Sequence, residues 1–103
     1  MNKTSPLQMQ TPRKTDTRNR FDWMEGLDCN GELISKNIRI GKHRTSIRLE
    51  ANMWASLDEI LKNENIDRSP LFDQIAKLKS PDSAFTAALR SFILSYYKRQ
   101  GSV

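Results

Sequence analysis

The sequence has little of the chemistry that most enzymes, metal sites and disulfide-bonded scaffolds need. It contains one cysteine, one histidine and four glycines among 103 residues. A lone cysteine, Cys29, cannot form an intramolecular disulfide or a cysteine-based zinc site, and this usage fits a reducing compartment. A lone histidine, His43, excludes most histidine-based catalytic and metal-binding arrangements as well. We therefore expect no enzyme, no cofactor and no metal site.

The sequence also lacks a long apolar segment. Nothing in it approaches the roughly 20 consecutive apolar residues that a membrane-spanning helix requires, and residues 1–20 contain no stretch typical of a signal peptide. A chain of this length forms one small domain, and its modest core makes association with a second copy an expectation. We expect a cytoplasmic protein with no membrane partner.

The net charge of +5 is distributed unevenly along the chain. Residues 1–20 carry five bases, one acid and few apolar side chains, and predict a disordered basic tail. Residues 21–34 carry four acids and no base, and predict an acidic linker or docking segment. Residues 36–48 carry five bases and no acid, which marks a candidate contact for a polyanion. The folded domain is expected over residues 35–100.

The basic segment has the pattern of a β-hairpin. Apolar residues alternate with polar ones over 38–40 and again over 47–49, but the two stretches are out of phase. A two-residue turn at Gly41 and Lys42 corrects the phase, and glycine in the first turn position suits a type II′ turn. One face then carries Ile38, Ile40, Thr45, Ile47 and Leu49. The other face carries Asn37, Arg39, Arg44, Ser46 and Arg48.

Three helices are expected after the hairpin. The spacing of apolar residues predicts the first over 50–64, with Asn65 as a left-handed C-cap. Ser69-Pro70 and Ser80-Pro81 each combine a hydroxyl N-cap with a proline at the first helical position, so they predict the next two helix starts. The second helix is expected to bury Leu71, Phe72, Ile75 and Leu78.

The run IRIGKHRTSIRLEANMWASLDEIL, residues 38–61, resembles the ribbon-helix-helix family of bacterial transcription regulators. In particular it is similar to a short bacterial subfamily in which an HRTSIRLE-type strand precedes W-x-x-L-x-E-I. The resemblance implies a homodimer in which the two strands pair antiparallel and enter the major groove of double-stranded DNA. The expected fold class is mainly α with a short β ribbon, a ribbon-helix-helix dimer with an additional C-terminal helix.

The resemblance also implies site residues. The family's outward strand positions match Arg44, Ser46 and Arg48, which are expected to contact bases. Arginine can bond bidentately to guanine O6 and N7, and serine is a permissive donor or acceptor. The start of the family's second helix, whose amides meet a phosphate, matches Arg68 and Ser69. Further phosphate contacts are expected from Arg39 and Lys42.

Two alternatives stay open. If residues 37–40 form an outer strand, the sheet of a dimer has four strands and is too wide to enter the groove flat, so the outer strands follow the DNA backbone or do not pair. The alternative function is a protein-interaction module or antitoxin-like protein, in which residues 21–33 or the third helix bind a partner protein. In antitoxins of the family that this sequence resembles, the tail that binds the toxin usually follows the domain. Here the long polar tail precedes the domain, which disfavours the antitoxin interpretation. The leading hypothesis is a nucleoid-associated regulator of transcription.

Overall fold

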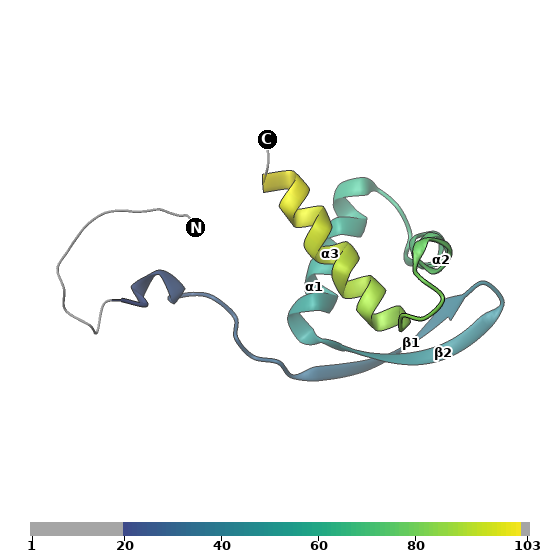
Figure 1. The fold of residues 1–103 in the computed structure, drawn as a ribbon, viewed down its shortest axis with the longest axis horizontal. Helices are drawn as coiled ribbons and strands as arrows, with labels where there is room; N and C mark the ends of the chain where they lie inside the picture. Colours follow the sequence, from purple (N-terminus) through teal and green to yellow (C-terminus); the bar gives the residue numbers. More distant parts are fainter. Residues whose placement is uncertain (1–19, 102–103) are drawn as a thin grey trace.

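The computed structural model describes residues 20–101 as a β-hairpin followed by three helices (Figure 1). A short 3-10 turn, η2 (Asp22–Met24), lies in an extended segment that leads away from the helices. Most of the predicted basic tail lies outside the described residues. Between residues 20 and 101 no helix has the length and apolar character to cross a membrane.

The helices and strands confirm the expected fold class for one chain, while the dimer stays a prediction. Strands β1 (Leu33–Ile40) and β2 (His43–Glu50) form a two-stranded antiparallel sheet. Helices α1 (Ala51–Glu64), α2 (Arg68–Leu78) and α3 (Phe85–Gly101) lie together on one side of that sheet (Figure 1). The domain is therefore mainly helical, with a short β ribbon and an additional C-terminal helix.

The hairpin has the register that the hydrophobic phase predicts. Ile40 pairs with His43 at the turn, and the pairing continues without a break to Leu33 and Glu50. Gly41 has φ +59° while Lys42 has an ordinary negative φ, as a type II′ turn requires. The sequence did not decide whether residues 37–40 form a strand. They do, as part of the longer strand β1.

The core lies between the inner face of the hairpin and the three helices. Its fully buried side chains are Leu49, Leu57, Ile60, Phe72 and Leu89. Burying a side chain of this size stabilises the fold by about 1.5–3 kcal/mol. Trp54 is 3% exposed, and its indole N–H donates to the Ile34 carbonyl at 2.9 Å, which joins α1 to β1.

The predicted starts of the second and third helices are wrong by a few residues. Helix α2 begins at Arg68 after the N-cap Asp67, so Pro70 lies inside the first turn, where its missing N–H has no helical partner to lose. Helix α3 begins at Phe85, because residues 80–83 form a separate turn in which the Ser83 N–H donates to the Ser80 carbonyl at 3.1 Å.

Other local predictions have mixed outcomes. Asn65 has φ 54° and caps α1, as predicted. Leu78 is 75% exposed, because it is the last residue of α2 and lies beyond the part of the helix that packs on the core. Thr45 is exposed too, although it shares the inner face with the buried Ile38 and Ile47.

Candidate functional site

The face of the hairpin that points away from the core carries the predicted strand residues. We call this the outward face, and its central positions are Ser35, Asn37, Arg39, Arg44, Ser46 and Arg48. All six side chains are exposed. The register sets Arg39 directly opposite Arg44, and Ser35 directly opposite Arg48. The structure therefore gathers the predicted base-contacting residues on one surface, because strand side chains alternate between two faces.

The outward face is positively charged with little compensation. Glu50, at its far end, is the only acid among the outward positions of the hairpin. Its Oε1 accepts a hydrogen bond from Arg90 Nε at 2.9 Å. That bond to the Arg90 guanidinium lowers the pKa of Glu50 below its ordinary value. Across the described part of the chain, no carboxylate lies within ion-pair distance of the arginines at 39, 44 and 48.

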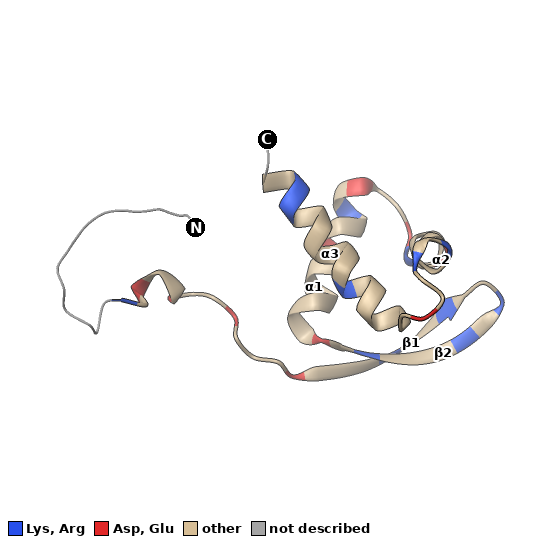
Figure 2. Cartoon of the chain, viewed as in Figure 1, with Lys and Arg blue, Asp and Glu red and all other residues tan. Residues whose placement is uncertain are grey.

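The charges along the chain are separated in space as well as in sequence. Figure 2 shows lysine and arginine on both strands of the hairpin, while acids mark the extended segment before it. The acids of that segment are Asp22, Glu25, Asp28 and Glu32. The outward face thus presents a field that attracts an anion from outside the domain.

A shallow cleft lies on this face near the tip of the hairpin. It has a volume of about 200 Å³ and is lined by Asn37, Ile38, Arg39 and Arg44. Further along the same face, the Ser35 and Ser46 hydroxyls share a hydrogen bond of 2.8 Å. Ser46, a predicted base-contacting residue, therefore already has one hydrogen-bond partner and keeps its remaining capacity for a ligand.

The tip of the hairpin is fastened to α2. The Asp73 Oδ1 accepts a hydrogen bond from the Gly41 backbone N–H at 2.7 Å. Lys42, the next residue in the turn, is exposed. The sequence did not indicate this role for Asp73, since an aspartate in the middle of a helix carries no local signal of a partner 32 residues away.

The predicted residues at the start of α2 lie in a different setting. Ser69 is exposed, whereas Arg68 is half-buried and donates to Asp58 Oδ1 at 3.1 Å. The Arg68 guanidinium also lies 5.4 Å from the centre of the Trp54 ring, and Lys36 Nζ lies 5.1 Å from the same centre. Arg68 is thus engaged within the domain, while the arginines of the outward face form no salt bridge with any residue between 20 and 101.

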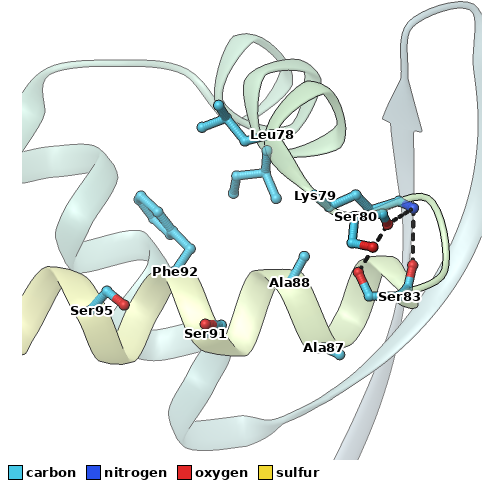
Figure 3. A pocket seen from close by; sticks show the side chains of 10 residues that line it. Leu78, Lys79, Ser80, Ser83, Ala87, Ala88, Ser91, Phe92 and Ser95 are labelled. Atoms are coloured by element: carbon cyan, nitrogen blue, oxygen red, sulfur yellow. Dashed lines mark hydrogen bonds between the residues drawn. The ribbon is translucent and has the colours of Figure 1, made fainter.

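A larger cavity lies between the end of α2 and α3 and has a volume of about 450 Å³ (Figure 3). Leu78, Ala88 and Phe92 line it. Lys79 is its one ionisable lining residue, and the ammonium donates to the Ser80 and Ser83 carbonyls at 3.2 and 2.9 Å. Within residues 20–101 no three His, Cys, Asp or Glu side chains group to hold a metal ion.

Comparison with known proteins agrees with this arrangement. A model of a protein family described as "Ribbon-helix-helix domain" matches residues 33–97, which span both strands, α1, α2 and most of α3. No curated protein and no solved structure matches the chain.

Proposed function

The chain belongs to the ribbon-helix-helix family, and we propose that it is a dimeric, sequence-specific DNA-binding protein that regulates transcription. We propose a cytoplasmic, nucleoid-associated location and no enzymatic activity. One observation carries the proposal. The outward face presents three exposed arginines without a carboxylate partner among the described residues, on a strand pair whose other face packs on the helices.

The shape of the hairpin suits the major groove of DNA. The groove is about 12 Å wide and admits a two-stranded β ribbon. We assign base contacts to Arg44, Ser46 and Arg48, whose side chains project from β2 on the outward face. Arginine pairs bidentately with guanine, and serine accepts or donates to several base edges.

The proposed dimer uses the free edge of β2. Within the described chain β2 pairs only with β1, so its other edge offers a row of unpaired backbone N–H and C=O groups. Antiparallel pairing of this edge with the same edge of a second copy places the two β2 strands at the centre of one sheet. The two sets of base-contacting residues then lie side by side, as a symmetric operator requires.

Phosphate contacts supply affinity without sequence information. We assign them to Arg39, Lys42, Arg68 and Ser69. The first two lie at or near the tip of the hairpin, while the other two lie in the first turn of α2, where the helix dipole favours an anion. Arg68 must exchange its bond to Asp58 for one to phosphate, and this exchange makes its contribution smaller than that of Arg39.

Enrichment of bound duplexes from a random-sequence DNA pool tests this function. The wild type should enrich a discrete sequence motif. Arg48→Ala should relax the preference at one position of the motif and lose about 1–3 kcal/mol of binding free energy. Arg99→Ala, which removes the same charge from the exposed last turn of α3, is the matched control and should keep the motif. A wild type that enriches no motif would falsify the proposed sequence-specific function.

A second candidate function rests on the segment before the hairpin. Phe21, Trp23, Met24 and Leu27 are 37–69% exposed there and pack on no core residue. Aromatic side chains at such positions are typical of an interface with another protein. Capture of one defined protein by the wild type but not by Trp23→Ala, in the absence of salt-sensitive DNA binding, would favour an interaction module.

A further inference from the structure

Arg39 and Arg44 face each other across the hairpin, and this arrangement is unfavourable by itself. They are directly opposite in the antiparallel register, on the exposed outward face. Like charges at opposite positions destabilise a strand pair. Since neither guanidinium has a carboxylate partner among residues 20–101, this part of the chain supplies nothing that neutralises the pair.

The cleft that these two arginines line contains hydrogen-bond donors that suit an anion. Asn37 lines it together with both arginines and precedes Arg39 by two residues on the same face. An asparagine amide offers two N–H donors, and each guanidinium offers five. The planar fork of arginine matches the oxygens of a phosphate. The donor set and its positive charge therefore fit a phosphate.

The width of the proposed dimer decides which part of DNA reaches this cleft. Neighbouring strands lie about 4.8 Å apart, so the outer strands of a four-stranded sheet lie about 14 Å from each other. The major groove is about 12 Å wide. The two central β2 strands can enter the groove, whereas each β1 strand lies over one of the two sugar-phosphate backbones that border it.

We propose that the cleft holds one backbone phosphodiester of DNA in each chain, with Arg39 and Asn37 as its ligands. Arg44, on the central strand, borders the cleft and extends toward the base edges. This inference rests on the proposed function and deepens it. It adds Asn37 to the DNA-binding residues and assigns the whole outward side of β1 to the backbone. The negative charge of the phosphodiester offsets part of the repulsion between the two arginines.

Three single-substitution variants of the full-length chain test the site, with random-sequence duplex DNA as the probe. Arg39→Ala should weaken binding and make the slope of log K against log salt less negative. The slope should change by roughly 0.9 for each phosphate that is no longer neutralised, and hence by about 2 for a dimer. Asn37→Ala should weaken binding with an unchanged slope. Asn37→Asp should weaken binding about tenfold or more, because the new carboxylate repels phosphate. Lys62→Ala, on the exposed last turn of α1, is the charge-matched control.

Folding and sequence preference are measured in parallel. Asn37→Asp should melt at the same or a higher temperature than the wild type, since its carboxylate can pair with the arginines that border it. The motif enriched by Arg39→Ala and Asn37→Ala should equal that of the wild type. A changed motif would show that β1 reads bases and would overturn the inference. If all three variants bind DNA as the wild type does, the phosphate site is wrong but the proposed function stands. If the wild type binds no duplex, both the phosphate site and the proposed function are wrong.

Discussion

The Asp73 carboxylate accepts a hydrogen bond from the backbone N–H of Gly41 at 2.7 Å, and this bond fixes the tip of the hairpin to α2. Ile40, the residue before Gly41, also packs against the core at this end of the hairpin. Gly41 adopts a positive φ there, which glycine tolerates without strain. The bond therefore couples the orientation of the outward face to the helical core.

Asp73→Ala should lower both stability and DNA affinity. Because hydrogen bonds with a charged partner are stronger than neutral ones but this one is exposed, the expected loss is about 1 kcal/mol in the free energy of unfolding. Urea unfolding measures that loss, and fluorescence anisotropy with duplex DNA measures affinity. Gln74→Ala, at the exposed neighbouring position, should leave both unchanged. Equal behaviour of the two variants would show that the bond does not hold the tip.

Trp54 should be the tryptophan on which folding depends. It is 3% exposed and bonds to the Ile34 carbonyl, whereas Trp23 is 69% exposed. Trp54→Ala should cost about 3–5 kcal/mol, the usual range for removing a buried aromatic side chain. Trp23→Ala should change the free energy of unfolding by less than about 0.5 kcal/mol. Urea denaturation of both variants checks this contrast, which fails if Trp54→Ala unfolds at the wild-type urea concentration.

Tyr97 should make the domain lose stability in alkali. Burial, together with donation of its hydroxyl to the Glu59 carboxylate, raises the pKa of Tyr97 to about 12 from the ordinary 10.0. The unfolded chain therefore loses this proton first, and stability that is fully present below pH 10 declines as the pH rises toward 12. Tyr96 acts in the same direction, because its bond to Glu64 raises its pKa.

Tyr97→Phe isolates this effect. The variant should be less stable than the wild type at pH 9, since it lacks the hydroxyl, and the difference should shrink between pH 10 and pH 12. Urea unfolding at each pH provides the measurement. A difference that stays constant over this range would contradict the raised pKa of Tyr97.

The bond between Glu50 and Arg90 should stabilise the fold at neutral pH and fail in acid. Because Arg90 lowers the pKa of Glu50, the contribution is present above the ordinary carboxyl pKa of 4.5 and is lost as the pH falls below that value. Glu50→Gln should therefore melt below the wild type at neutral pH and approach it in acid. A melting difference that is independent of pH would rule out this role for the carboxylate.

The hairpin and its two faces were predictable because their signals are local. Apolar residues in the two strands are out of phase, and the turn at Gly41 and Lys42 is the shortest connection that restores the phase. Once the turn is fixed, the period of two in a strand assigns each side chain to a face. The outward positions of Arg44, Ser46 and Arg48 follow without any tertiary information.

The helix starts and the tertiary contacts were not predictable in the same way. Ser69-Pro70 and Ser80-Pro81 carry the same local signal, yet the first lies within the first turn of α2 and the second lies in a turn before α3. Proline is tolerated anywhere in a first turn, so it does not fix where the helix begins. The engagement of Arg68 by Asp58 and Trp54 likewise depends on how two helices pack.

The central claim is that duplex DNA binds the outward face of the hairpin, and an NMR titration tests it most directly. The full-length ¹⁵N-labelled chain is titrated with a duplex taken from the enriched pool. We predict that the largest amide shifts fall on Asn37, Arg39, Arg44, Ser46 and Arg48, while the amides of α3 shift little. Shifts concentrated on α3 or on residues 21–32, with the outward face unchanged, would contradict it.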